Sequence, residues 1–409
     1  MKTLLIIGFI WPEPTSTAAG TRMLQLIEVF KTNAYQITFA CSASKTINSF
    51  NLNSLNIQTT NIQLNDSSFD SFIAELNPDL VLFDRFLTEE QFGWRVTENC
   101  SKAIRILDTE DLHFLRKARQ TAYKNNTTVS LEYLTNDLTK REIASIYRCD
   151  LTLIISKYEM KLLKKTFKID TEILQYLPFL IDTNTLKPLK EYPSFQERAN
   201  FVSIGNFKHE PNWNAVLVLK NNIWPLIKQK LPNAKMLIYG AYATQKAQQL
   251  HHEKDDFLIK GWAESTEKVI SNSKVCLAPL QFGAGLKGKL IDAMQFGTPS
   301  VTTTIGAEAM HKKLPWNGFI CDNYEEFALK AVELYIQEKT WQGAQKNGLD
   351  ILNKCFSKEK YSQKLLNKIE YLEQDKTAHR LQNFIGSLLL HHTLKSTKYM
   401  AKWIEEKNK

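Results

Sequence analysis

A segment rich in glycine and lysine, residues 282–289, combines residue types suited to binding an anion. An apolar, strand-like run precedes it at 275–280, and a helix-like run follows at 290–294. Glycine lets backbone N–H groups approach an anion closely, and the start of a helix adds partial positive charge. Lys287 and Lys289 stand beside that helix start, where they can neutralise a diphosphate. The alternative is two solvated lysines, but cations oppose the dipole of a helix N-terminus unless an anion binds there.

Asp292, one helical turn further on, is the next polar residue of this segment. Its carboxylate can accept hydrogen bonds from the hydroxyl groups of a ribose or another sugar. An acidic residue in the first turn also interacts favourably with the helix dipole, which is a purely structural interpretation. Together with the two lysines, Asp292 favours a site for a nucleotide sugar.

A second group of chemically active residues follows the strand expected at 104–107. It contains Asp111 and His113, and a histidine can move a proton between substrate groups. We expect these two residues to contact the transferred sugar or its acceptor; the alternative is a capped helix start. Asp84 and Arg85 follow another strand end and are expected on the acceptor side, or else at the start of a surface helix.

Two pairs of adjacent histidines, at 251–252 and 391–392, suggest a metal site. Neighbouring residues of a helix point in different directions, however, and no third ligand has suitable spacing. We therefore expect no metal site.

The elements that must position these residues alternate between strands and helices in two successive halves. Strands are expected in the first half at 4–9, 35–40, 79–83, 103–107 and 151–155. In the second half they are expected at 201–204, 235–239, 257–259, 275–280, 300–303 and 319–321. Continuous apolar strands separated by helices are typical of parallel sheets covered on both faces. This predicts an α/β fold with two Rossmann-like domains, residues 1–181 and 182–372.

Residues 373–409 are expected to form a basic helical tail. Its apolar residues follow helical spacing and are succeeded by lysines: Leu381, Phe384, Ile385, Leu388, Leu389, then Lys395, Lys398 and Lys402. Two interpretations remain open. The tail packs back across the first domain, or it lies on an anionic membrane with its apolar stripe in the interface.

Composition narrows the class of protein. The 409 residues are 43% hydrophobic and 23% charged, with a net charge of +9, which is typical of a globular protein that meets anionic partners. The basic residues are dispersed without a recognition motif, so nucleic acid is not an expected partner. Six scattered cysteines without paired spacing indicate free thiols and a cytoplasmic location.

With these features the chain resembles the GT-B glycosyltransferases, specifically glycosyltransferase family 4. The resemblance is carried by Gly205, residues 211–215, 283–299 and 306–308, and at the N-terminus by residues 11–14 with Gly20 and Arg22. It implies two domains facing across a cleft, with the nucleotide sugar on the second, and transfer with retention and without a metal. It places Lys287 and Lys289 on the diphosphate and Asp292 on the ribose. The further binding residues expected are Gly20, Arg22, Gly205, Gly283, Ala284, Gly285, Leu286 and Glu308.

The chain departs from the family pattern at three places. The usual pair of acidic residues, spaced eight apart, falls at Ala284 and Asp292, so the first carboxylate is absent. The second is an aspartate instead of a glutamate. The usual Arg–Lys pair after the first strand of the second domain is replaced by Asn206 and Pro211. Lys287 and Lys289 are expected to supply the missing positive charge.

The function expected is therefore transfer of a sugar from a UDP- or GDP-sugar to a hydroxyl of a glycan or lipid-linked glycan. The nucleotide sugar is a substrate, and no cofactor is expected. The location expected is the cytoplasm, with peripheral contact at the inner face of the membrane if the tail binds lipid. Two alternatives remain: an inactive scaffold that kept the fold, and a sugar-nucleotide epimerase.

Overall fold

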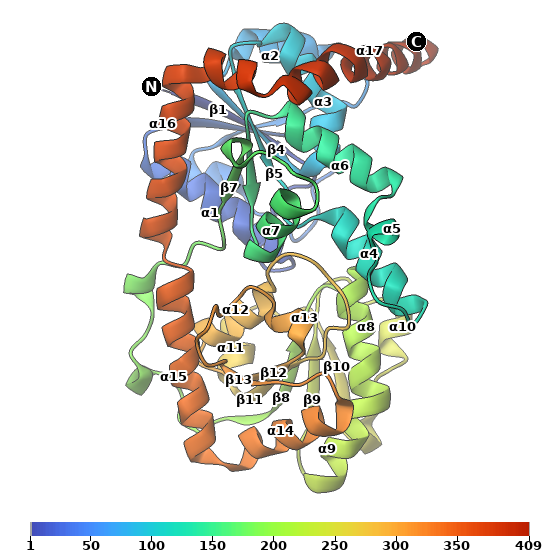
Figure 1. Ribbon diagram of the computed structural model, residues 1–409. Helices are drawn as coiled ribbons and strands as arrows, with labels where there is room; N and C mark the ends of the chain where they lie inside the picture. The colour runs from blue at the N-terminus through green and yellow to red at the C-terminus, as the bar shows by residue number, and fades with distance from the viewer. Residues whose placement is uncertain (1, 409) are drawn as a thin grey trace.

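The computed structural model describes residues 2–408, without the side chains of residues 392–394, and contains two α/β domains (Figure 1). The first is built on a seven-stranded parallel sheet in the order β3-β2-β1-β4-β5-β6-β7. Its strands are β1 (Thr3–Gly8), β2 (Gln36–Cys41), β3 (Gln58–Asn61), β4 (Leu80–Asp84), β5 (Ile104–Asp108), β6 (Leu151–Ile154) and β7 (Leu174–Tyr176). Its helices are α1 (Ala18–Thr32), α2 (Ser68–Leu76), α3 (Arg85–Asn99), α4 (His113–Lys124), α5 (Leu131–Leu134), α6 (Asp137–Arg148) and α7 (Lys157–Lys165).

The central strands β1 and β4 are almost entirely apolar because both faces of the sheet are covered, whereas the edge strand β3 is polar and partly exposed. Successive side chains of a strand point to opposite faces. Leu4 and Ile6 of β1 therefore join the core on one face, and Leu5 and Ile7 join the core on the other. The continuous apolar runs predicted as buried parallel strands are confirmed.

The second domain is built on a six-stranded parallel sheet in the order β10-β9-β8-β11-β12-β13. Its strands are β8 (Ala199–Ile204), β9 (Met236–Tyr239), β10 (Phe257–Gly261), β11 (Ser273–Ala278), β12 (Ser300–Thr302) and β13 (Gly318–Ile320). Its helices are α8 (Glu210–Val218), α9 (Trp224–Lys230), α10 (Gln245–Gln248), α11 (Thr266–Ser271), α12 (Gly288–Gln295), α13 (Thr304–Ala307), α14 (Tyr324–Ile336) and α15 (Glu338–Cys355). The predicted order of strand, glycine loop and helix is present as β11, residues 279–287 and α12.

The chain returns to the first domain near residue 357, where Ser357 forms a parallel bridge with Ile181. Helix α16 (Lys358–Gln382) then runs along the first domain, and α17 (Phe384–Lys407) crosses it beside α3 and α6 (Figure 1). Apolar side chains of α16 belong to the core of the first domain: Tyr361, Leu365, Ile369 and Leu372. The predicted domain limit at residue 372 is therefore corrected to residue 357.

The tail packs on the first domain, as one of its two interpretations expects. Arg380 forms a two-point ion pair with Asp150, at 2.7 and 2.8 Å. Asn383 donates to the carbonyl of Tyr147 at 2.7 Å, and Ala401 of α17 is buried. The opposite face of α17 leaves apolar side chains exposed: Phe384, Ile385, Leu388, Tyr399, Met400 and Trp403.

Candidate functional site

A cavity of about 610 Å³ lies between the two domains, at the carboxyl ends of strands from both sheets. Ligands of parallel α/β sheets bind at this edge. The structure brings most of the predicted site residues into the wall of this one cavity: Asp111, His113, Gly205, Gly283, Ala284, Leu286, Lys287, Lys289 and Asp292. Gly285 lies between them in the same loop.

The starts of two helices meet at this cavity. Thr17 caps α1, and its Oγ1 accepts a hydrogen bond from the N–H of Gly20 at 2.9 Å. Lys287 is the N-cap of α12, and its side chain caps no backbone group. A Cβ placed on Gly288 would lie 2.6 Å from the Cβ of Ala18, so the first residues of α1 and α12 are in contact. The positive ends of two helix dipoles therefore converge on one part of the cavity, which favours an anion there.

The two lysines of the glycine loop are used differently. The Nζ of Lys287 donates to the carbonyl oxygens of Gly285 at 2.8 Å and Ala284 at 3.2 Å, so it holds the loop together. Among the described residues, Lys289 donates no hydrogen bond and forms no ion pair, and its Nζ lies beside Gly205. Burial lowers the pKa of each lysine to about 8. Of the two lysines, Lys289 therefore has all its donors available to an anionic ligand, whereas Lys287 keeps one.

Asp292 of α12 lines the same wall as Lys289. Burial raises the pKa of its carboxyl to about 7, although the charge of Lys289 acts to lower it. Its carboxylate accepts no hydrogen bond from any described residue. Gly205 forms the adjacent wall, where a Cβ would meet the side-chain amide of Asn212 at 2.7 Å and Lys289 at 2.8 Å. The absence of a side chain at Gly205 keeps this corner of the cavity open.

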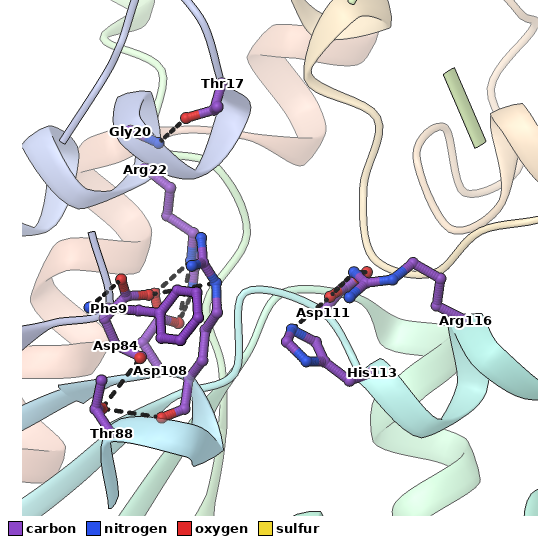
Figure 2. Close-up of polar contacts among 11 residues, drawn as sticks. Phe9, Thr17, Gly20, Arg22, Asp84, Thr88, Asp108, Asp111, His113 and Arg116 are labelled. Carbon is purple, nitrogen blue, oxygen red and sulfur yellow. Dashed lines mark hydrogen bonds and ion pairs between the residues drawn. The ribbon is translucent and has the colours of Figure 1, made fainter. Parts of the chain in front are cut away.

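Asp111, His113 and Arg116 form a polar cluster on the first-domain side (Figure 2). Arg116 donates to the Oδ1 of Asp111 at 2.5 Å, and the Nε2 of His113 lies 3.5 Å from the same oxygen. Burial acts to raise the pKa of Asp111, but the charge of Arg116 lowers it to about 2. Burial lowers the pKa of His113 to about 4. At neutral pH the cluster therefore holds a carboxylate and a neutral imidazole that can accept or relay a proton.

The first domain holds the glycine loop of the second through direct contacts. Arg119 of α4 donates to the carbonyl of Gly283 at 2.8 Å and forms a two-point pair with Glu308, at 2.8 and 2.7 Å. The Oε1 of Glu159 accepts the N–H of Gly285 at 2.8 Å. The methyl group of Ala284 packs into the first domain's core. A carboxylate at position 284 would be buried among apolar side chains in this arrangement.

Four predicted binding residues are absent from the cavity wall, and one of them, Gly285, lies within the glycine loop between residues that line it. The guanidinium of Arg22 is buried and pairs with both oxygens of Asp108, and its Nη1 also donates to the carbonyl of Leu177 at 2.8 Å (Figure 2). It therefore has no donor directed at a phosphate. Gly20 is a packing residue, because a Cβ there would lie 2.4 Å from the backbone of Glu13. Glu308 is engaged by Arg119 rather than presented to a ligand.

Two residues that sequence reasoning did not single out line the cavity. Glu110 adopts a left-handed backbone, with φ of 61°, directly before Asp111. His209, at the start of α8, is buried enough that its pKa falls to about 4. In the sequence, the position of Glu110 directly after a strand end could have identified it as a site residue. No sequence feature identifies His209, which only the fold brings to the cavity. Arg85, expected on the acceptor side, also lines the cavity.

The histidines and cysteines outside the cavity were also considered as metal ligands or disulfide partners. No three His, Cys, Asp or Glu side chains are grouped as metal ligands within residues 2–408, leaving aside 392–394. The side chain of His392, part of one histidine pair, lies outside the described residues. The six cysteines are buried and unpaired in the described chain. No helix of this part of the chain has the length and apolar character needed to cross a membrane.

Comparison with known proteins gives a family match in the second domain. Residues 198–337 match the family model described as group 1 glycosyl transferases, which covers the walls formed by the second domain. No match was found among curated protein sequences. The glycosyltransferase resemblance is thus confirmed in the domain that carries the glycine loop.

Several solved structures share the fold over nearly the whole chain. Sucrose-phosphate synthase from Thermosynechococcus elongatus has a TM-score of 0.68 at 13% identity, covering 91% of this chain and 99% of its own. HepE from Anabaena, in complex with UDP and glucose, has a TM-score of 0.69 at 12% identity, covering 90% and 100%. TarM from S. aureus, in a complex that contains UDP, has a TM-score of 0.68 at 10% identity, covering 90% and 99%. The GT-B fold is confirmed, and family model and fold together support sugar transfer.

Proposed function

We propose that this GT-B protein transfers a sugar from a UDP- or GDP-sugar to a hydroxyl of a glycan or lipid-linked glycan. The observation that carries the proposal is the contact between the starts of α1 and α12, beside which Lys289 has no partner within the described part of the chain. Two converging helix dipoles and a partly buried ammonium form an anion site between the domains. A diphosphate bound there places its nucleoside against the second domain and its sugar toward the first.

In this proposal the leaving diphosphate is stabilised by Lys289, Lys287 and the N–H groups at the start of α12. Preorganised donors of this kind act where negative charge develops in the transition state. The acceptor hydroxyl attacks from the face that the diphosphate leaves, so the anomeric configuration is retained. The diphosphate takes the acceptor proton, and no cofactor or metal enters the reaction. His113 and Asp111 contact the sugar or the acceptor from the first domain.

The nucleoside is assigned to the wall formed by Asp292 and Gly205. The Asp292 carboxylate, without a protein partner among the described residues, is placed to accept the ribose hydroxyls. UDP is the first nucleotide to test, because the complexes of HepE and TarM contain UDP. GDP remains the alternative.

The acceptor and location are proposed from the surface of the first domain. The exposed apolar side of α17 carries Tyr399, Trp403 and Leu388, and Lys395 and Lys402 are exposed on the same helix. Apolar side chains and lysines on one helix are suited to an anionic bilayer. This surface supports a cytoplasmic enzyme that reaches a lipid-linked acceptor at the inner face of the membrane.

The test is calorimetric titration of UDP and GDP into the wild type and Lys289→Ala. We expect one nucleotide to bind and its Kd to rise by about tenfold or more in the variant, which corresponds to about 1.4 kcal/mol. Because the pKa of Lys289 is about 8, affinity should fall as pH rises from 7 to 9, when the ammonium loses its proton. Lys289→Arg should reduce this pH dependence, since a guanidinium stays charged.

Lys246→Ala, on the exposed side of α10, is the matched control and should bind like the wild type. Binding of neither nucleotide would indicate the inactive scaffold instead. Conversion of a nucleotide sugar into an isomer, with no nucleotide released in the presence of acceptors, would indicate the epimerase.

A further inference from the structure

Glu110 is a strained residue at the point where the first domain meets the glycine loop. Its φ of 61° lies in the left-handed region, which residues other than glycine, asparagine and aspartate adopt rarely. A Cβ on Gly285 would lie 3.3 Å from the carbonyl oxygen of Glu110 and 2.8 Å from the Cβ of Asp111. Backbone strain of this kind persists where the surrounding structure imposes it, and it concentrates at functional sites.

The carboxyl group of Glu110 lacks a partner that it would be expected to have. Its Oε1 is buried and accepts no hydrogen bond within the described chain, although the residue lines the cavity. A buried polar atom without a partner costs about 1–3 kcal/mol. The neighbouring charges are already paired: Arg22 with Asp108, and Arg85 with Asp84 at 3.7 Å.

The protonation state of Glu110 also favours a contact with a ligand. Burial, with the nearby carboxylates of Asp108 and Asp84, raises its pKa well above the ordinary value, although Arg22 and Arg85 act to lower it. A protonated carboxyl has both a donor and an acceptor. Such a group suits a sugar hydroxyl, which also donates and accepts.

The other acidic residues of the first domain near the loop are occupied or face away from the cavity. Asp111 is held by Arg116. Glu159 accepts from the N–H groups of Leu112 and Gly285, and it is not part of the cavity wall. Glu110 is the acid of this group that both lines the cavity and has an unused oxygen.

We propose that Glu110 binds the hydroxyl groups of the transferred sugar, the part of the donor beyond the diphosphate. The inference rests on the proposed function and deepens it by naming a contact that selects the sugar. With the diphosphate at the start of α12, the sugar lies in the part of the cavity lined by Ala284 and Glu110. Glu110 then supplies from the first domain a carboxyl group that the second domain lacks at Ala284.

Two substitutions separate this role from a structural one. Glu110→Gln keeps the shape of the side chain and, like a protonated carboxyl, offers both a donor and an acceptor. Glu110→Gly removes the side chain and suits the left-handed backbone, so it relieves strain and should raise the melting temperature. Glu132→Gln, exposed on α5, is the matched control. Nucleotide release is measured with UDP-glucose, UDP-N-acetylglucosamine and GDP-mannose, and UDP and GDP binding by calorimetry.

We expect Glu110→Gly to lose at least tenfold in kcat/KM for the donor that the wild type uses, and Glu110→Gln, which keeps a donor and an acceptor, to lose much less. The Kd of UDP or GDP should stay within twofold of the wild-type value, because these nucleotides lack the transferred sugar that Glu110 contacts. An unchanged Kd also shows that the cleft of the variant is intact. A kcat/KM within twofold of wild type in Glu110→Gly would overturn the inference and leave the proposed function standing. A wild type that binds neither nucleotide would overturn the proposed function and this inference together.

Discussion

At the scale of single residues, charged side chains in this protein divide into those that hold the fold and those left for a ligand. Arg22 and Asp108 pair with each other in the core of the first domain. Lys289 and Asp292 have no hydrogen-bond partner among the described residues, although both are largely enclosed. The cost of burying charge is offset inside the protein for the first pair, and we infer that a ligand offsets it for the second.

Arg22→Ala tests this division. The substitution leaves the carboxylate of Asp108 buried without its partner, so the free energy of unfolding should fall by about 3–5 kcal/mol. Urea denaturation followed by circular dichroism measures this loss. At a temperature where the variant remains folded, its nucleotide Kd should stay within a few fold of the wild-type value. If the variant instead binds nucleotide more weakly and keeps its stability, Arg22 contacts the phosphate, as expected from the sequence.

At the scale of elements, the candidate site depends on how closely α1 and α12 approach. Gly288 opens α12, and there is no room for a side chain between it and Ala18. The two helices belong to different domains. Their contact therefore fixes the distance between the domains and the point at which the positive ends of both helix dipoles meet. A small residue is required here for the approach and not for an unusual backbone, since Gly288 has no positive φ.

Gly288→Val should push the two helix starts apart and weaken nucleotide binding by about tenfold, because less of the positive potential reaches the diphosphate. Calorimetry measures the loss. Gly343→Ala is the control: no atom lies within 4 Å of the added Cβ in α15, and the substitution should stabilise the protein by about 0.5–1 kcal/mol. Unchanged nucleotide affinity in Gly288→Val would show that the helix starts do not form the anion site.

At the scale of the whole molecule, the two domains are joined by chain connections and by side chains that cross the cleft. The Arg119–Glu308 pair spans it, and Tyr242 donates to both carboxylate oxygens of Glu13, at 2.8 and 2.7 Å. Helices α16 and α17 bind the end of the chain to the first domain. These contacts therefore hold the two domains together over the glycine loop.

A double-mutant cycle on Arg119→Ala and Glu308→Ala measures the contribution of this contact to closure. We expect a coupling energy of about 1–3 kcal/mol in thermal or urea unfolding, since the two groups are largely desolvated. Small-angle scattering of Arg119→Ala should show a larger radius of gyration than the wild type. Additive effects in the cycle, together with an unchanged radius, would exclude the pair as a closing contact.

From the sequence alone, the order of strands and helices could be predicted and is confirmed, and an anion site in the second domain could be proposed. Apolar runs without alternation predicted strands buried on both faces, and β1, β4, β8 and β11 are such strands. Glycines and lysines between a strand and a helix predicted the anion site at the start of α12. These features are local: side-chain pattern and helix polarity fix them within a few residues of chain.

The tertiary structure alone decided which charges are used and where the domains end. Arg22 and Glu308 were expected at the ligand, but their partners come from distant parts of the chain, Asp108 and Arg119. Residues 358–372 were predicted to belong to the second domain, but their apolar side chains are buried against the first. The apolar pattern of a helix shows that one face is buried, and it does not show against which sheet. The left-handed backbone of Glu110 is likewise a feature of the folded chain and not of the residue type.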